Sequence, residues 1–212
     1  MEYIYNERTN VLVEPLLPDG SLIVALHGGY GTPANLQLKV NLEAEFPNSF
    51  IIYASAAASK VWKSGAKLSD VSYLHSLVEK LGVDYPSIDL TKVHLFGHSN
   101  GGMMCYKLAA VLDEFGFASI TVISGSYNAD NTFDYAGKVL HFHTANDSVV
   151  AIDGSGDFPS IVETIAKVNE VHQNSKFRIE STNLNDTDAH KIDLVFAAFP
   201  LLITDIKEHM GL

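Results

Sequence analysis

The stretch from Lys92 to Met104 reads Lys-Val-His-Leu-Phe-Gly-His-Ser-Asn-Gly-Gly-Met-Met. Its apolar part, Val93–Phe96, predicts a buried strand, and residues 103–112 predict a helix. Between them lies Gly-x-Ser-x-Gly, which in this setting is a nucleophile elbow centred on Ser99. Side chains at the two glycines of so sharp a turn would collide with neighbouring backbone. The motif therefore predicts Ser99 exposed at the end of a strand, facing the positive end of a helix dipole.

Strand patterns alternate with helix patterns along the rest of the chain. Apolar runs predict further buried strands at 22–26, 50–53, 120–123, 139–143 and 177–179. Helical spacing predicts helices at 33–46, 70–81, 157–171 and about 194–210. Residues 192–196 fit a helix and a strand equally well. Two short strands at 3–5 and 11–13, joined by a tight turn, are expected to pair antiparallel. The pattern predicts an α/β fold with a mostly parallel central sheet and helices on both faces.

The composition is that of an ordinary globular protein. The 212 residues suit a single domain, 1–212, with a sizeable core. The net charge of −11 argues against nucleic acid and anionic membranes as main partners. Cys105 is the only cysteine, which excludes an internal disulfide, and it is expected to be a small core residue.

The N-terminal sequence shows no targeting signal. Met-Glu-Tyr-Ile-Tyr-Asn has neither a basic start nor a long apolar run, so no signal peptide is predicted. No apolar stretch approaches 18 residues, so no membrane span is predicted. These features favour a cytoplasmic protein, with a secreted mature form left open, and they do not indicate an oligomeric state.

A serine hydroxyl is a weak nucleophile and needs a histidine base, which in turn needs a carboxylate to orient it. In a fold with this elbow the chain order is Ser, then Asp or Glu, then His. Asp147 is the best acid, because it follows the predicted strand 139–143 at the carboxyl edge of the sheet. Asp153 is the next candidate, followed by Asp157.

Three histidines follow the acid in the sequence. His190 lies in the polar loop after the last predicted strand, where the base is expected. His172 falls at the end of a helix, on the wrong side of the sheet, and His209 lies near the end of the terminal helix. The order of residues therefore predicts a triad of Ser99, Asp147 and His190.

The tetrahedral intermediate of acyl transfer needs two fixed N–H donors, and losing one raises the barrier by about 3 kcal/mol. One should be the backbone N–H of Asn100, the residue after the serine. The other should come from the glycine-rich loop 27–32, whose glycines let the backbone approach a substrate closely. Gly29 is the expected donor and Tyr30 the alternative.

Five further residues are candidates for roles near this site. Tyr30 and Trp62 are expected to line a substrate pocket, although a packing role for Trp62 fits equally well. His98, at the variable position of the elbow, is a substrate-binding candidate that is expected to pack or orient locally. His141 and His143 alternate along one strand, but no third ligand stands at a recognisable spacing, so no metal site is predicted.

These segments resemble the α/β-hydrolase superfamily, and more narrowly the esterase family that includes polyhydroxybutyrate depolymerases and feruloyl or acetylxylan esterases. The narrower resemblance rests on Ser-Asn-Gly-Gly-Met at 99–103. It is supported by Asp-Leu-Thr-Lys-Val at 89–93, Leu-His-Gly at 26–28, the Trp62 loop followed by Asp-Val at 70–71, and an acid loop at 143–150. The match covers roughly residues 22–113 and 138–154.

The chain departs from this family at two places. Thr144 stands where the family usually has Gly. The family's histidine usually lies in Gly-His-x-Trp-Pro, whereas His190 is preceded by Asp-Ala and followed by Lys-Ile. The chain is also short, which leaves room for at most a minimal lid.

The resemblance implies a serine carboxylic-ester hydrolase acting on small or medium esters, of short-chain acyl, feruloyl, acetyl or hydroxyalkanoate type. The triad of such a hydrolase works through an acyl-enzyme and requires no metal or organic cofactor. Two alternatives stay open. One is a thioesterase or acyl-peptide hydrolase, as in the phospholipase/carboxylesterase relatives. The other, from a different class, is a non-catalytic ligand-binding protein on a hydrolase fold.

Overall fold

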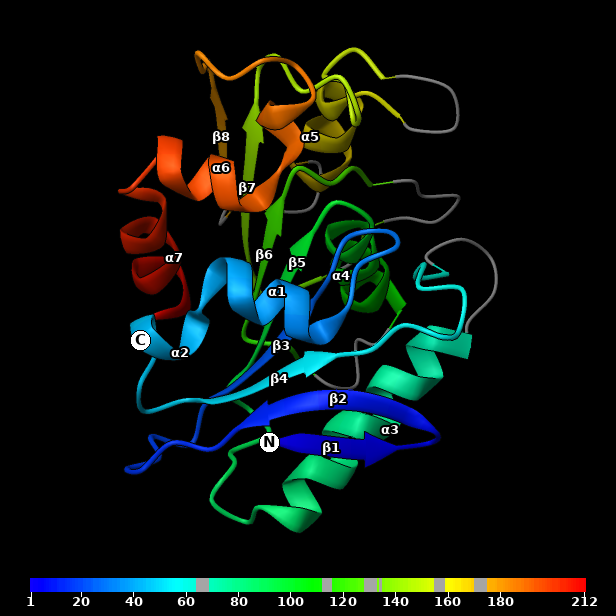
Figure 1. The fold of residues 1–212 in the computed structure, drawn as a ribbon, viewed down its shortest axis with the longest axis vertical. Coiled ribbons are helices and arrows are strands. Elements are labelled where there is room, and N and C mark those ends of the chain that lie inside the picture. Colours follow the sequence, from blue (N-terminus) through cyan, green and yellow to red (C-terminus); the bar gives the residue numbers. More distant parts are fainter. Residues whose placement is uncertain (64–68, 112–115, 128–132, 134, 155–158, 170–174) are drawn as a thin grey trace.

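The computed structural model describes residues 1–63, 69–111, 116–127, 133, 135–154, 159–169 and 175–212. Its strands form one eight-stranded sheet in the order β1-β2-β4-β3-β5-β6-β7-β8 (Figure 1). They are β1 (Glu2–Tyr5), β2 (Arg8–Val13), β3 (Leu22–Leu26), β4 (Phe50–Ala54), β5 (Val93–His98), β6 (Ser119–Ile123), β7 (Lys138–Thr144) and β8 (Ser175–Glu180). β2 pairs antiparallel with β1 and with β4, and every other pair is parallel. The predicted α/β fold is confirmed.

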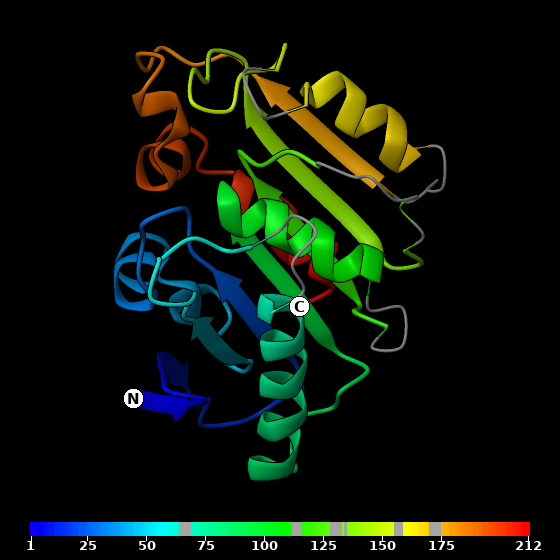
Figure 2. The same cartoon turned by 90° about the vertical axis from the view of Figure 1, so that its right-hand side faces the viewer.

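Helices cover both faces of this sheet. They are α1 (Pro33–Val40), α2 (Leu42–Glu45), α3 (Ser69–Asp84), α4 (Asn100–Val111), α5 (Ile161–Asn169), α6 (Ile192–Ala198) and α7 (Leu202–Met210), with a 3₁₀ turn, η2, at Asp188–His190. Figure 2 views the face with α3, α4 and α5, and the other helices lie on the opposite face. None of the described helices is both long enough and apolar enough to cross a membrane.

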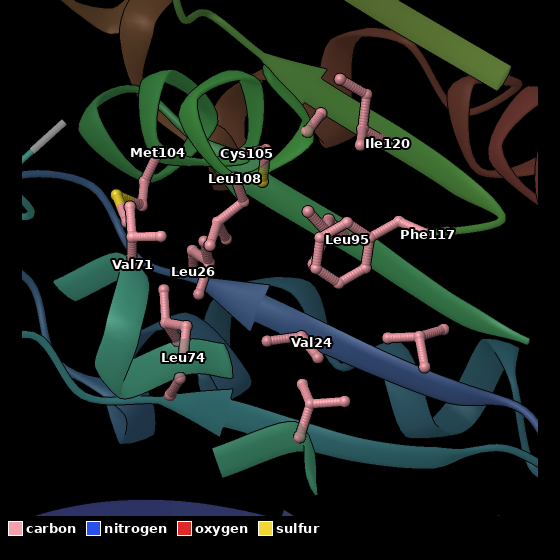
Figure 3. Close-up of a cluster of buried hydrophobic side chains, with 14 of the residues drawn as sticks. Val24, Leu26, Val71, Leu74, Leu95, Met104, Cys105, Leu108, Phe117 and Ile120 are labelled. Atoms are coloured by element: carbon pink, nitrogen blue, oxygen red, sulfur yellow. The ribbon is translucent and has the colours of Figure 1, made fainter. Parts of the chain in front are cut away.

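The two faces arise from alternation along the buried strands. In β3, Val24 and Leu26 belong to the core under α3 and α4, whereas Ile23 and Ala25 belong to the core under α1, α6 and α7. Both faces are buried, which explains why β3 is apolar throughout. Figure 3 shows the first core, in which Cys105 is fully buried, as predicted.

Two predicted helices are each broken in two. The segment 33–46 is interrupted at Asn41, which adopts a left-handed conformation (φ +44°) between α1 and α2. The C-terminal segment is interrupted before Pro200, because a residue preceding proline is disfavoured in the helical region; Phe199 has φ −126° and ψ +70°. Residues 192–196, which fitted both structures in the sequence, are helical and belong to α6.

The register of the parallel strands brings several loops to one edge of the sheet. Leu26 is paired with Gly97, and His98 is paired with Ile123. The loops that follow β3, β5 and β7 therefore all leave the sheet at its carboxyl edge, which is where ligands bind in open α/β sheets.

Candidate active site

Ser99 occupies a strained turn between β5 and α4. Its backbone has φ +53°, a left-handed conformation that is uncommon for residues other than glycine. The Ser99 N–H donates to the carbonyl of Ile123 at 2.9 Å, and the Ser99 carbonyl accepts from the N–H of Met103 at 3.0 Å. α4 therefore begins directly after Ser99, three residues earlier than predicted.

The two glycines of the motif are required by backbone contacts. A Cβ at Gly97 would overlap the carbonyl of Gly101. A Cβ at Gly101 would come within 2.6 Å of the His27 carbonyl O, and closer still to that of Leu26. This packing places the end of β3 directly against the turn that carries Ser99.

The three side chains of the predicted triad form one hydrogen-bonded chain. His190 Nε2 lies 2.8 Å from Ser99 Oγ, and His190 Nδ1 lies 2.7 Å from Asp147 Oδ2. His190 belongs to η2, and Asp147 follows β7. These residues are 43 and 91 positions apart in the sequence, so only the parallel sheet and its last crossover bring them together.

The electrostatics of Asp147 fix the direction of both hydrogen bonds. Burial alone would raise the pKa of this carboxyl, but hydrogen bonding and charge from His190 outweigh burial, and the net pKa lies below its ordinary value. Asp147 Oδ1 also accepts from the N–H groups of Val149 and Val150, at 2.9 and 3.0 Å. An ionised Asp147 accepts from His190 Nδ1–H, which leaves Nε2 to accept the proton of Ser99.

The loops that carry the acid and the histidine are tied together by side chains. Thr144 Oγ1 donates to the carbonyl of Ala189 at 2.7 Å, and Asn146 Nδ2 donates to the carbonyl of Leu184 at 2.7 Å. In the sequence, Thr144 stands out only as a departure from the resembled family. A hydroxyl in place of an expected glycine was the one available signal of this link.

The other acid and base candidates lie elsewhere or outside the described residues. Asp153 is exposed, and His190 already has Asp147 as its carboxylate partner. His209 Nε2–H donates to the carbonyl of Ile120, near the start of β6 and so at the opposite edge of the sheet. Asp157 and His172 lie outside the described residues.

Two backbone N–H groups beside Ser99 fit the expected oxyanion hole. Among the described residues, neither Asn100 N–H nor Gly29 N–H has a hydrogen-bond acceptor. A Cβ built on Gly29 would stand 3.8 Å from Asn100 Cβ, so the two residues are neighbours. The N–H of Tyr30, the alternative donor, donates instead to the Lys60 carbonyl at 2.7 Å.

Trp62 joins Asn100 to the end of β3 by hydrogen bonds. Its backbone N–H donates to Asn100 Oδ1 at 2.6 Å, and its carbonyl accepts from Asn100 Nδ2 at 3.1 Å. Its indole N–H donates to the carbonyl of His27 at 2.9 Å. The side chain is 1% exposed and does not line the cavity beside the triad, which leaves it no surface for a substrate. Of the two roles that the sequence leaves open for Trp62, this burial favours packing.

His98 contacts the backbone of the histidine segment. Its Nε2–H donates to the carbonyl of His190 at 2.8 Å, and the two ring centroids are 5.1 Å apart. Burial and the neighbouring His190 lower the pKa of His98 to about 3, so the ring stays neutral. The expectation that His98 orients its surroundings agrees with this contact.

A cavity of about 230 Å³ opens beside the triad. It is lined by the loop 27–32, His98 and His190, together with residues of α1 and the start of α6. Tyr30 lines it and is 82% exposed. The charged lysines at the cavity, Lys39 and Lys191, are each paired with an aspartate, at 2.9 and 2.7 Å. A cavity of this size fits a small substituent on a substrate.

The histidine pair of β7 does not form part of a metal centre in the described portion of the chain. His141 and His143 are fully buried and hydrogen-bond to each other. Across the described ranges, no group of three or more His, Cys, Asp and Glu side chains is arranged to hold a metal ion.

No protein-family model matches this sequence, and no curated protein matches it. Solved structures match it over nearly its whole length. Esterase PE8 has 17% identity and a TM-score of 0.67, over 95% of this chain and 99% of that one. Acetyl xylan esterase from Aspergillus awamori has 16% identity and a TM-score of 0.72, over 96% of this chain and 94% of that one. FphF, a fluorophosphonate-binding serine hydrolase of Staphylococcus aureus, has 13% identity and a TM-score of 0.72, over 97% and 96%.

At such identities the likeness concerns the fold. The chain has the α/β-hydrolase fold of known esterases, as the sequence predicted.

Proposed function

We propose that this chain is a serine carboxylic-ester hydrolase. The observation that carries the proposal is the continuous chain of hydrogen bonds from Asp147 through His190 to Ser99 Oγ, at 2.7 and 2.8 Å. It stands at the carboxyl edge of an α/β-hydrolase sheet, beside two backbone N–H groups that have no acceptor in the described part of the chain. The fold neighbours named esterase, acetyl xylan esterase and serine hydrolase support the same reaction class.

The reaction follows from these positions. Ser99 Oγ attacks the ester carbonyl carbon while His190 Nε2 takes its proton, and the N–H groups of Asn100 and Gly29 bind the oxyanion. The intermediate collapses when the C–O bond to the leaving alcohol breaks and His190 protonates that oxygen. Water then attacks the acyl-enzyme, again with His190 as base, and the acid product leaves Ser99 free. Asp147 stabilises the imidazolium in both halves of the reaction.

The cavity supports small or medium esters as substrates. Its volume of about 230 Å³ accommodates a short acyl or alcohol group, and Tyr30 and His98 are in place to contact it. Acetyl, feruloyl, hydroxyalkanoate and simple short-chain esters share this chemistry, and rates on matched oxygen esters, thioesters and amides would rank the bond types.

The direct test compares wild type with Ser99→Ala on p-nitrophenyl esters from acetate to decanoate. We expect wild type to turn over the shorter esters, and Ser99→Ala to lose at least about 10³-fold in kcat. A fluorophosphonate should label wild type at Ser99 and leave the variant unlabelled. A folded wild type that neither hydrolyses esters nor labels at Ser99 would instead be a ligand-binding protein on this fold.

A further inference from the structure

Buried polar side chains behind the acid loop form a hydrogen-bond network that the proposed reaction does not use. Tyr106 Oη, on α4, lies 2.7 Å from His141 Nδ1. His141 Nε2 lies 3.2 Å from His143 Nδ1, and His143 Nε2 lies 2.8 Å from the carbonyl O of Val150. The two histidines are two residues apart on β7, so they share one face of the sheet, where their rings stack at 5.4 Å. Tyr106, His141 and His143 are fully buried.

The carbonyl of Val150 fixes the direction of every proton in this network. A carbonyl oxygen can only accept, so His143 Nε2 carries the hydrogen and Nδ1 of the neutral ring is an acceptor. His141 must then donate from Nε2, and its Nδ1 accepts from the Tyr106 hydroxyl. Burial lowers the pKa of both histidines, which keeps them neutral. Both rings have all their polar atoms satisfied in a single arrangement.

The backbone of Val150 connects this network to the acid. Its carbonyl accepts from His143, and its N–H donates to Asp147 Oδ1 at 3.0 Å. His143 Nε2 also lies 3.5 Å from Asp147 Oδ2, the oxygen that accepts from His190. The backbone of Val150 is therefore held by the buried histidine through its carbonyl, in the peptide to Ala151, and it holds the carboxylate through its N–H, in the peptide from Val149.

We propose that His143 is a positioning residue for Asp147, held in one orientation by His141 and Tyr106. The inference rests on the proposed function, because it gives the network the task of fixing the carboxylate that orients His190. Without the N–H of His143, the Val150 carbonyl loses its donor, the backbone at Val150 is free to shift, and the acid that its N–H holds can leave its place beside His190. A displacement of about 1 Å in such a group lowers the rate about 10²-fold.

Three variants separate positioning from folding. His143→Phe keeps a ring of similar size but removes the donor, whereas His143→Gln supplies an amide N–H close to the place of Nε2. His94→Phe makes the same exchange at another buried histidine, which bonds to Ser119 at the opposite edge of the sheet. It serves as the matched control for the cost of placing phenylalanine in this core.

The first measurement is kcat on p-nitrophenyl butyrate. It is expressed per mole of Ser99 labelled by a fluorophosphonate, so that misfolded protein does not count. We expect His143→Phe to lower this kcat by about 10- to 100-fold with little change in KM. His143→Gln should recover most of the loss, and His94→Phe should equal wild type. A wild-type kcat per labelled site in His143→Phe would overturn the proposal, and so would an equal loss in the Phe and Gln variants.

The second measurement needs no substrate. The His190 Nδ1 proton, in a short hydrogen bond to a carboxylate, should give a far-downfield NMR resonance. This resonance should move upfield or vanish in His143→Phe and persist in His143→Gln. If it responds in this way while wild type hydrolyses no ester, the proposed function fails and the positioning role stands. An unchanged resonance in His143→Phe removes the positioning role, whatever the activity.

Discussion

The hydroxyl of Thr144 donates a hydrogen bond of 2.7 Å to the carbonyl of Ala189, the residue immediately before His190. Both residues are fully buried. Thr144 ends β7, and Asp147 follows three residues later, so this bond joins the strand that carries the acid to the segment that carries the histidine. The resembled esterases usually have glycine here, which has no side-chain donor. In this chain, threonine adds a link between the two loops.

Replacing Thr144 with valine should test this link, since valine keeps the shape and removes the hydroxyl. Thr144→Val leaves a buried carbonyl without a partner, so we expect the free energy of unfolding to fall by about 1–3 kcal/mol. Because the histidine segment loosens, kcat should fall as well. Urea unfolding and ester hydrolysis measure the two effects.

Thr121→Val is the matched control. Thr121 is also fully buried, on β6, and its hydroxyl has no hydrogen-bond partner among the described residues. Removing that hydroxyl should leave stability unchanged or raise it, because a buried group without a partner is itself unfavourable. Equal losses in the two variants would show that the Thr144 hydrogen bond contributes nothing specific.

Asp147→Asn should abolish most activity while preserving the fold. The amide is the same size, but it lacks the charge that stabilises the His190 imidazolium and sets its tautomer, so a loss of about 10⁴-fold in kcat is expected. Asp153→Asn, at an exposed carboxylate, should behave as wild type. Full activity of Asp147→Asn would move the acid to another residue.

Adjacent glycines in the loop after β3 should respond differently to alanine. A Cβ at Gly28 would stand 3.0 Å from His98 Nδ1 and 3.3 Å from Ser99 Cβ, whereas a Cβ at Gly29 would meet, of the described residues, only Asn100, at 3.8 Å. Gly28→Ala must displace residues of the site and should lose about tenfold or more in kcat, equivalent to about 1.4 kcal/mol. Gly29→Ala keeps its backbone N–H and should stay near wild type. A larger loss of kcat in Gly29→Ala than in Gly28→Ala would contradict the position assigned to this loop.

Trp62→Phe should lower stability and kcat without altering substrate preference. The variant leaves the His27 carbonyl without its indole donor, which costs about 1–3 kcal/mol of folding free energy. The loop beside Asn100 should loosen, so kcat should fall for every ester alike. The profile of kcat/KM against acyl length checks this, and a changed optimum would place the indole in contact with substrate.

Buried histidines should make the fold sensitive to acid. Burial, together with the charges of His209 and Lys138, lowers the pKa of His94 to about 4, against about 6.5 in the unfolded chain. Between these values the unfolded state binds the proton first, so stability falls as the pH drops from about 6.5 to 4. His94→Gln should reduce the slope of unfolding free energy against pH by up to about 1.4 kcal/mol per pH unit.

Measurements at pH 8 provide the reference for this variant. His94 is neutral in both states there, so any difference in stability from wild type reports packing and the lost hydrogen bond to Ser119. Identical slopes for wild type and His94→Gln below pH 6.5 would show that another group dominates the acid response.

Much of the candidate site follows from local sequence. The elbow requires small residues at 97 and 101 for steric reasons, and the chain order of acid and base selected Asp147 and His190 without any knowledge of their distance. The packing role of Trp62 could not be separated from a pocket role, because both need a large side chain near the loop. The choice between Gly29 and Tyr30 as oxyanion donor depended on Lys60, whose carbonyl accepts from the Tyr30 N–H. This contact joins residues 30 positions apart and is not visible in the sequence.

The sequence by itself determined the order of strands and helices, the position of the strained serine and the residues that could join it, because these depend on local sterics and hydrophobic periodicity. Only the tertiary structure decided which polar groups meet: Thr144 with Ala189, His143 with Val150, and His98 with His190. The two residues of each pair belong to different segments, which are separated along the chain by a turn or by a crossover. Their contact depends on sheet register and packing, which no pattern within a single segment encodes.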